Sequence, residues 1–461
     1  MAVALGLGID ESYMVAAGRE LRLGYFDHPP LSWWLSSGIA QLTGSEAAWV
    51  VRLPFIALFA VSTALMWRLG SLLISTEAGK WAAVAFNLAP VFGVTTGGWV
   101  LPDGPLVCAL LGMAVCLAHA LAGRGLGWWL ATGLLAGLAM LSKYSAALTL
   151  AGGFVYLLTQ PDHRRWLARP GPWLAVGLCL LVFSPVVAWN AANGWASFAF
   201  QGGRAAASRS APAGPFVALA GQALFLLPWV WLGLVIAWVG AIRQGPARWQ
   251  TWLLACLAVP PILVFTVVAL WSRNVLYHWA APGYLFLFPL LGERLARWRR
   301  TRPWVRRAVP ASFALLAAGL LLVAAEVRLN LLGLPRDPAL QAIDWTALKP
   351  ELARRGLLDL AIAAPGWADA GKLDYALGGM PRVACLNVDC RQFRFGHASD
   401  GLIGRDVLII VPRQAPMRLV GEYGPLFDRI ELLPPLRLDL PHRPPTDFSL
   451  LLGHRLKAWI Y

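Results

Sequence analysis

The sequence predicts a polytopic α-helical membrane protein that carries a small α/β domain at its C-terminal end. Three observations lead to this prediction. Of the 461 residues, 58% are hydrophobic and only 14% are charged, whereas soluble proteins carry about 25% charged residues. About ten apolar runs approach the roughly 20 residues that a spanning helix needs. The composition then changes near Leu331, where polar residues become frequent.

Ten candidate spans follow one another along the first two thirds of the chain. They cover residues 50–74, 81–100, 105–122, 127–141, 145–158, 171–188, 215–242, 251–271, 279–291 and 309–325. Before Asp10 stands only the segment MAVALGLGI, which is too short to span a bilayer. We therefore expect a first helix to be missing, because alternation of the spans would place Met1 on the outer face.

The net charge of +15 reflects topology rather than a nucleic-acid partner. Basic residues stand in short loops between alternate spans, culminating in the segment ERLARWRRTRPWVRR at residues 293–307. The positive-inside rule makes that face cytoplasmic, so we expect the unusual polar segments to lie on the opposite, non-cytoplasmic side. A soluble basic patch with stacking aromatic residues, which nucleic-acid binding would need, is absent from the sequence pattern.

The segment 331–461 is predicted to be an extracytoplasmic α/β domain, following a transmembrane domain over residues 1–330. Residues 357–364 and 406–412 have the apolar pattern of buried strands. Residues 344–355 are typical of a helix that Asp344 caps and Gly356 follows. Cys385 and Cys390 could close a short disulfide loop in an oxidising compartment, or could be two free thiols.

The first loop, residues 10–49, is unusually polar for its position. Asp10 and Glu11 stand together, and a carboxylate at a membrane surface could serve as a general base. Two acids are also common at a helix N-terminus, where they favour the macrodipole. In the segment GYFDHPP, Pro29 and Pro30 disfavour helix before them and hold Asp27 and His28 in a defined loop. The helix that follows should lie in the membrane interface through its tryptophans.

Further polar residues collect on the same outer face at the ends of predicted spans. A carboxylate such as Asp103 at the end of a span is costly without a partner. Arginine forks match phosphate oxygens, and histidine adds a titratable donor. Taken singly, each is most often an ordinary interface residue. The candidates for substrate binding are Tyr25, Asp27, His28, Lys143, Tyr144, Asn190, Gln201, Arg204, Arg273 and His278.

The segment DESYMVAAGRELRLGYFDHPP resembles the first periplasmic loop of bacterial C-type membrane glycosyltransferases related to protein O-mannosyltransferases and to the aminoarabinose transferase of lipid A. LPDGPL, LSKYSA, WNAANGWASFAFQ and HWAAPGY are similar to segments at corresponding places, and so are GKLDYALGG and CLNVDCRQFRF in the tail. The resemblance covers nearly the whole chain. It depends on the combination, because no single piece is specific.

The resemblance implies inverting transfer of a sugar from a polyprenyl-phosphate donor to a lipid, glycan or protein hydroxyl. Asp10 would be the general base, and Glu11 would support it. Asp103 would orient the acceptor or the catalytic residues. His28 stands where some relatives carry a lysine near the donor phosphate. Lys143, Arg204, Arg273 and His278 are the candidates for contacting that phosphate.

Other functions remain as alternatives to transfer. A transporter or flippase for a lipid-linked substrate would also use intramembrane charges, although it should place them midway along broken helices. A structural membrane protein without catalysis is a third reading. No histidine pair has metal-ligand spacing on a helix, and a divalent ion between Asp10 and Asp103 is left open. The sequence has no Gly-rich phosphate loop before a helix, which disfavours a nucleotide donor.

Overall fold

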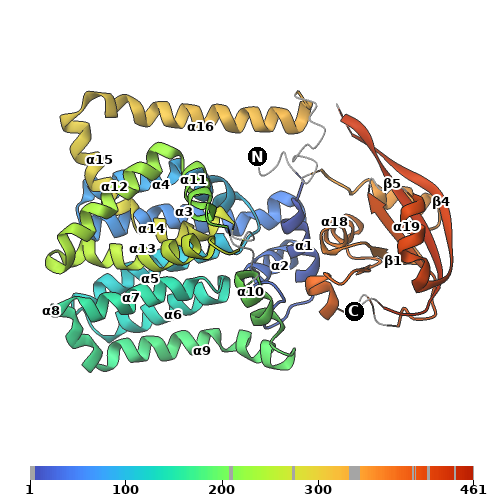
Figure 1. The fold of residues 1–461 in the computed structure, drawn as a ribbon, viewed down its shortest axis with the longest axis horizontal. Coiled ribbons are helices and arrows are strands. Elements are labelled where there is room, and N and C mark those ends of the chain that lie inside the picture. Colours follow the sequence, from blue (N-terminus) through green and yellow to red (C-terminus); the bar gives the residue numbers. More distant parts are fainter. Residues whose placement is uncertain are drawn as a thin grey trace. The chain divides into compact units, whose positions relative to one another are not determined.

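The computed structural model describes residues 6–206, 211–272, 276–331, 343–396, 399, 401–412, 416–440 and 443–459. The chain forms two compact units, and each unit is built from segments that are not consecutive in the sequence. One, here called the helical unit, contains residues 22–32 and 53–317. The other, here called the α/β unit, combines residues 1–21 and 33–52 with residues 318–461. Figure 1 shows the elements of both.

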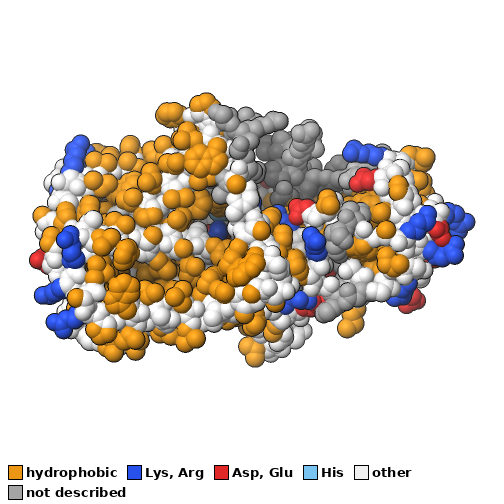
Figure 2. Space-filling view, turned by 60° about the horizontal axis from the view of Figure 1, so that its bottom comes forward, with side chains coloured by type: hydrophobic (Ala, Val, Ile, Leu, Met, Phe, Trp, Pro, Cys, Tyr) orange, Lys and Arg blue, Asp and Glu red, His pale blue; other side chains and the backbone are white. Residues whose placement is uncertain are grey.

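Six of the described helices are long and apolar enough to cross a membrane. They are α3 (Ala48–Leu73), α5 (Asp103–Leu121), α9 (Pro170–Ala192), α12 with its short extension (Pro228–Ala247), α13 (Trp249–Val268) and α16 (Pro303–Leu329). Three shorter apolar helices accompany them, α6 (Leu126–Ser142), α7 (Ala146–Thr159) and α11 (Gly214–Leu226). The surface of the helical unit is largely hydrophobic (Figure 2). The predicted polytopic class is therefore confirmed.

Two predicted spans are broken in the structure. The run at 81–100 becomes α4 (Thr76–Leu88) and a π-helix (Val91–Thr96), because Pro90 cannot donate the backbone hydrogen bond that would continue α4. The run at 215–242 becomes α11 and α12. Leu227 between them has φ of 68°, and the following Pro228 disfavours helical backbone at that position.

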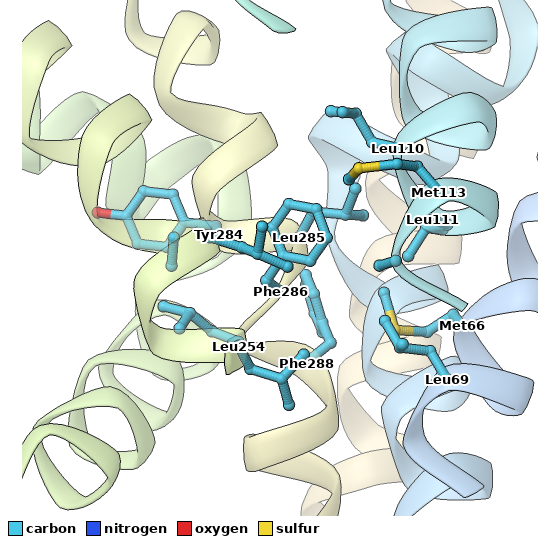
Figure 3. Close-up of a cluster of buried hydrophobic side chains, with 14 of the residues drawn as sticks. Met66, Leu69, Leu110, Leu111, Met113, Leu254, Tyr284, Leu285, Phe286 and Phe288 are labelled. Atoms are coloured by element: carbon cyan, nitrogen blue, oxygen red, sulfur yellow. The ribbon is translucent and has the colours of Figure 1, made fainter. Parts of the chain in front are cut away.

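The core of the helical unit consists of aromatic and aliphatic side chains from helices distant in sequence. Figure 3 shows Phe286 and Phe288 facing Leu110 and Met113 of α5. The Phe86 ring packs against Phe288 with centroids 5.8 Å apart. Helices also approach closely at glycine: a Cβ on Gly133 would lie 2.3 Å from the carbonyl oxygen of Ala175. Small residues at such crossings are how membrane helices pack.

The basic loops meet at one end of the helical unit. The Arg248 guanidinium lies 2.9 Å from the Glu293 carboxylate, and Arg299 lies 4.0 Å over the ring of Trp81. These contacts join the loop after α12, helix α15 (Phe288–Thr301) and the start of α4. Lys and Arg side chains gather at that end in Figure 2. The grouping of basic loops on one face, as inferred from the sequence, is thus present in the fold.

The α/β unit is built on a five-stranded sheet with strand order β2-β1-β3-β5-β4. The strands are β1 (Ala361–Ala364), β2 (Val383–Cys385), β3 (Val407–Pro412), β4 (Phe427–Leu440) and β5 (Arg443–Leu456). β1 pairs in parallel with β2 and β3, whereas β5 pairs antiparallel with β3 and β4. The strands predicted within residues 357–364 and 406–412 are confirmed. The β4–β5 hairpin was not predicted.

Five helices complete the α/β unit. They are α1 (Ile9–Gly18), α2 (Leu31–Thr43, from Trp33 onward), α17 (Leu348–Arg354), α18 (Trp367–Leu377) and α19 (Pro416–Tyr423). Gly356 follows α17 with φ of 66°, as predicted, although Asp344 caps a turn by accepting from the Thr346 N–H at 2.9 Å rather than capping α17 itself. A disulfide joins Cys385 and Cys390.

The remaining helices are short and connect these elements. They are α8 (Pro161–Arg164), α10 (Ala196–Ala206), α14 (Ala281–Leu285) and the 3-10 turns at Arg165–Ala168, Gly245–Ala247, Tyr277–Ala280, Arg391–Phe395 and Gly424–Leu426.

Candidate active site

Asp10 and Glu11 lie in the first turn of α1, where acidic residues complement the helix dipole. Gly8 is the N-cap, and its N–H donates to Glu11 Oε2 at 3.0 Å. Glu11 is 3% exposed, whereas Asp10 is exposed. The two neighbouring acids therefore have different environments, and Asp10 presents its carboxylate at the surface of the α/β unit.

Glu11 forms a buried ion pair with Arg52 of α3. Arg52 Nε donates to Oε1 at 2.8 Å and Nη2 donates to Oε2 at 2.5 Å, so the pair is bidentate. Arg52 Nη2 also donates to the carbonyl of Gly6 at 3.0 Å. Arg52 was missed in the sequence, although a lone arginine inside the apolar run AWVVRLPF is an unusual feature that marks a partner or a function.

Helix α18 packs directly against α1 (Figure 1). A Cβ on Gly371 would lie 2.7 Å from Tyr13 Cα, so glycine permits this close approach. The Tyr13 hydroxyl accepts the N–H of Gln392 at 3.0 Å, and its ring meets Trp367 edge-on at 5.2 Å. The acidic helix α1 is thus held by residues from the C-terminal third of the chain.

Two charged groups from α18 reinforce this packing. Lys372 is 4% exposed and donates to the carbonyl of Leu7 at 2.9 Å; burial lowers its pKa to about 8. Asp374 pairs with Arg19 at the other end of α1, and Arg19 Nε also donates to Glu46 at 2.8 Å. Sequence reasoning missed Lys372, Arg19 and Asp374, because nothing in a single sequence shows that α18 contacts α1.

In the helical unit, Asp103 and Lys143 form an ion pair. Lys143 Nζ lies 2.9 Å from Oδ1 and 3.0 Å from Oδ2 of Asp103. Asp103 begins α5, and Lys143 ends α6. Their side chains are 15% and 12% exposed respectively, so the charges are mostly removed from solvent. Asp103 thereby has the partner that a carboxylate at the end of a span requires.

His278 and Arg204 extend this pair into a polar cluster. His278 lies within electrostatic range of Asp103, Lys143 and Arg204. Burial lowers the pKa of His278 to about 4, and the charge of Lys143 adds to the effect, so the imidazole is neutral at pH 7. Arg204 stacks over the ring of Trp279 with its guanidinium carbon 4.5 Å from the centroid, and a guanidinium group matches the geometry of phosphate oxygens.

The loop at Asp27 and His28 joins the same cluster. His28 lies within electrostatic range of Asp103, and the Gln201 amide donates to the Asp27 carbonyl oxygen. Both contacts lie inside the helical unit. Pro29 and Pro30 precede α2 directly, so the predicted loop and its ending are confirmed.

Asn190 and Tyr144 build the scaffold around these charges. Asn190 Oδ1 accepts the N–H groups of Ser197 and Phe198, each at 3.2 Å, and thereby fixes the start of α10. The Tyr144 hydroxyl lies 2.7 Å from Ser197 Oγ. α10 carries Gln201 and Arg204, so these two scaffold residues position binding candidates.

The other predicted site residues have different surroundings. Tyr25 is fully buried, and its hydroxyl accepts the Arg22 N–H at 3.3 Å; burial raises its pKa to about 12. Arg273 lies outside the described residues. Trp33 is wholly buried against Gly18, so the expectation that it anchors the loop in the membrane interface is wrong. Helix α1, which ends at Gly18, covers the Trp33 indole, which the sequence pattern predicted to lie against lipid.

An apolar pocket of ≈ 330 Å³ lies among α5, α6, α7 and α9. Its lining runs from Trp129 and Leu167, next to the basic loops, to Met140 and Ala147, which flank Lys143 in sequence. The pocket thus lies along the same helices that present Asp103 and Lys143. Its walls can accommodate hydrocarbon and offer few polar partners.

The described residues do not gather three His, Cys, Asp or Glu side chains into a group that could hold a metal ion. Both oxygens of Asp103 already accept from Lys143. A divalent ion at Asp103 would therefore have to displace an ammonium group that balances the same charge.

These features define a class of protein. It is a polytopic membrane protein with a cationic cluster around a carboxylate where spanning helices end, and with an acidic helix held in an α/β unit. The cationic cluster suits phosphate oxygens, and the pocket suits a lipid chain.

Comparison with known proteins agrees with this class. A family model described as dolichyl-phosphate-mannose-protein mannosyltransferase matches residues 27–189. The lipid A galacturonosyltransferase RgtD of Rhizobium johnstonii is 25% identical over 183 residues, which make up 40% of this chain and only 38% of that protein. The crystal structure of ArnT from Cupriavidus metallidurans bound to undecaprenyl phosphate has a TM-score of 0.66 at 17% identity, covering 97% of this chain and 95% of that chain.

The apo structure of the same ArnT gives a TM-score of 0.66 at 15% identity, covering 97% of this chain and 93% of that chain. The chain therefore has the same fold as ArnT. These matches agree with the resemblance drawn from the sequence: residues 27–189 are similar to the mannosyltransferase family model, and the chain has the fold of ArnT.

Proposed function

We propose that the protein is an inverting glycosyltransferase that moves a sugar from a polyprenyl-phosphate donor to a hydroxyl of a lipid, glycan or protein. The observation that carries the proposal is the polar cluster of Asp103, Lys143, His278 and Arg204, in which Asp103 and Lys143 stand at the ends of helices that also line an apolar pocket. A polyprenyl phosphate would use both the cluster and the pocket, because cations stabilise its phosphate charge and apolar side chains accommodate its hydrocarbon chain. The curated relative and the family model matched by sequence are named as glycosyltransferases, and the ArnT structure of the same fold contains undecaprenyl phosphate.

The donor would bind through its phosphate to Lys143 and Arg204. Lys143 is the compact ammonium, and Arg204 offers a planar fork for two oxygens. Asp103 holds the Lys143 ammonium in place through both carboxylate oxygens. His278, neutral at pH 7, can donate a hydrogen bond to a phosphate oxygen without adding charge. The prenyl chain would lie along the pocket among α5, α6, α7 and α9.

The acceptor would be activated by Asp10. In the transfer step, the Asp10 carboxylate takes the hydroxyl proton while the acceptor oxygen forms a bond to the anomeric carbon. The bond from that carbon to the phosphate oxygen breaks, and its electron pair leaves on polyprenyl phosphate. The anomeric configuration inverts, because attack and departure occur on opposite faces of the sugar. Lys143 and Arg204 would stabilise the charge that develops on the leaving phosphate.

We place this reaction on the extracytoplasmic face of a bacterial inner membrane. The support is the segregation of basic loops to one end of the helical unit, which the positive-inside rule assigns to the cytoplasm. The polar cluster stands at the opposite ends of α5 and α6 from Arg124, which lies between them in the chain. The protein would also contact the surrounding bilayer lipids, and we expect no binding to nucleic acid.

The test is transfer of radiolabelled sugar in membranes that contain a panel of polyprenyl-phosphate donors. Asp10→Asn should abolish transfer and leave expression unchanged, because the amide cannot accept the proton. The matched control is Asp162→Asn, an exposed carboxylate on α8 among the basic loops, which should transfer like the wild type.

Other results of the same assay would change the proposal. Transfer that persists in Asp10→Asn would remove Asp10 from the mechanism and direct attention to Asp103. A wild-type protein that binds donors and transfers nothing would revive the flippase alternative, which flipping assays in vesicles can then examine.

A further inference from the structure

Lys372 is a buried charge that the proposed mechanism does not use. It lies on α18, is 4% exposed, and donates from Nζ to the carbonyl of Leu7 at 2.9 Å and to that of Ile343. Lysine is almost never fully buried without partners, because desolvating its charge is costly. Nearby carboxylates of Glu11 and Asp344 offset part of that cost.

The Leu7 carbonyl is one of three consecutive backbone groups that side chains hold in front of α1. Arg52 donates to the Gly6 carbonyl at 3.0 Å. Lys372 donates to the Leu7 carbonyl, and the Glu11 carboxylate accepts the N–H of Gly8 at 3.0 Å. Asp10 follows two residues later on the exposed side of the first helical turn. The start of α1 is therefore held by hydrogen bonds from side chains of α3, α18 and α1 itself.

The packing of α18 on α1 has independent supports that do not involve the amine. Gly371 allows backbone contact with Tyr13, and Tyr13 bonds to Gln392. A methionine at position 372 would fill nearly the same space with no desolvation cost. A buried ammonium that donates one hydrogen bond to the backbone before Asp10 and another to Ile343 therefore points to orientation of that backbone rather than to packing alone.

We propose that Lys372 is a positioning residue for glycosyl transfer, holding the backbone at Leu7 so that the Asp10 carboxylate keeps a fixed orientation toward the acceptor hydroxyl. This inference rests on the proposed function, because it assumes that Asp10 is the base. Lys372 touches no substrate and acts only through the segment 6–10. A general base must lie about 2.6–3.2 Å from the proton-bearing oxygen, and a displacement of about 1 Å can lower a rate by roughly 100-fold.

The experiment compares three lysine variants of the full chain in native membranes. Lys372→Met removes the hydrogen bonds, and Lys372→Arg keeps a permanent cation with donors. Lys349→Met is the matched control, because Lys349 lies in the same unit and donates to a backbone carbonyl, that of Leu377 at 2.5 Å. Initial rates give kcat and the KM for the polyprenyl-phosphate donor. Hydrogen exchange of the peptide covering residues 6–18 reports the order of the segment.

We expect Lys372→Met to lower kcat by about 10-fold or more, with the donor KM within about twofold of wild type. Its exchange at residues 6–18 should accelerate. Lys372→Arg should recover most of the rate, and Lys349→Met should match wild type in rate and exchange. Because partial unfolding would also lower the apparent kcat at constant KM, the distinguishing result is faster exchange confined to residues 6–18 at a wild-type melting temperature.

Several outcomes would overturn the proposal. Wild-type kcat in Lys372→Met would do so, and so would an equal loss in Lys349→Met accompanied by an equal fall in melting temperature. If the wild type itself transfers no sugar, the proposed function fails first. The exchange data then decide the positioning claim alone, because unchanged exchange at residues 6–18 in Lys372→Met would overturn it.

Discussion

Replacing Glu11 should lower the free energy of unfolding of the α/β unit more than replacing an exposed carboxylate. Glu11 and Arg52 have side chains 4% and 3% exposed, and their contact is bidentate at 2.8 and 2.5 Å. Glu11→Ala leaves the Arg52 guanidinium buried without its counter-charge, which costs about 3–5 kcal/mol. It also removes the acceptor for the Gly8 N–H, and loss of such an N-terminal cap costs a further ~0.5–2 kcal/mol.

A double-mutant cycle separates the ion pair from its surroundings. Arg52→Met alone should cost about 3–5 kcal/mol, because it strands the Glu11 carboxylate. Glu11→Met is the second single variant of the cycle and should also cost about 3–5 kcal/mol, because it strands the Arg52 guanidinium. The double variant Glu11→Met/Arg52→Met should be much less destabilised than the sum of these two single changes, because paired hydrophobic replacements of buried ion pairs are often neutral. We therefore expect a coupling free energy of about 2–3 kcal/mol, near the upper range for residues in contact.

The assay is denaturant unfolding of the purified protein in detergent, followed by tryptophan fluorescence. Asp439→Ala is the matched control, since that side chain is 89% exposed and its contact with Arg437 is 3.8 Å; exposed pairs are worth about 0–1 kcal/mol. A loss below about 1 kcal/mol in Glu11→Ala, or additive single variants, would refute the reasoning that the pair is desolvated and coupled.

Three further predictions concern the helical unit. Lys143→Met should raise the donor KM at least about 10-fold and Lys143→Arg much less, measured by initial rates at varied donor, because the cation facing phosphate is lost in one and kept in the other; equal KM values in all three proteins would contradict the assignment. His278 has its pKa lowered from 6.5 to about 4 in the folded protein, so the unfolded chain binds its proton first and stability should fall as pH drops from 6.5 toward 4. His278→Gln should flatten that part of the melting-temperature curve against pH, and an unaltered slope would dismiss the burial effect. Chelation by EDTA should leave the transfer rate within about twofold, because Lys143 already neutralises Asp103; a rate that disappears and returns with added Mn²⁺ or Mg²⁺ would show that a metal is needed.

The features predicted well from the sequence are those that local pattern controls. Apolar runs of spanning length, basic loops and the strands at Ala361–Ala364 and Val407–Pro412 depend on neighbouring residues, and the structure contains them. The segment before Leu31 was likewise readable, because proline restricts backbone locally.

The features that were missed depend on contacts between residues far apart in the chain. Lys372 looks like an ordinary surface charge until α18 is placed against the backbone before α1. Arg52 is an unusual charge in an apolar run, but its partners are known only once α3 is placed there as well. Trp33 has the composition of an interfacial anchor, and only the contact with Gly18 shows that it is buried. Single-sequence periodicity contains no information on such pairings.

The candidate site shows the same division. Lys143, Arg204 and His278 were chosen by residue type and membrane face, and the structure brings them to one cluster with Asp103. The role of each candidate could not be read from the sequence: Asn190, predicted as a binding residue, also accepts the N–H groups of Ser197 and Phe198 at the start of α10, and only the fold shows that contact.

The contact between Tyr13 and Gln392 spans 379 residues, which has a consequence for biosynthesis. A ribosome adds about 5–20 residues per second, so roughly 20–75 s pass between synthesis of α1 and synthesis of its partner. During that interval the helix that bears Asp10 has none of the α18 side chains to pack on. The nascent chain therefore completes its membrane-spanning helices before α18 can pack on its acidic helix, and premature termination before α18 removes the support that α18 gives to that helix.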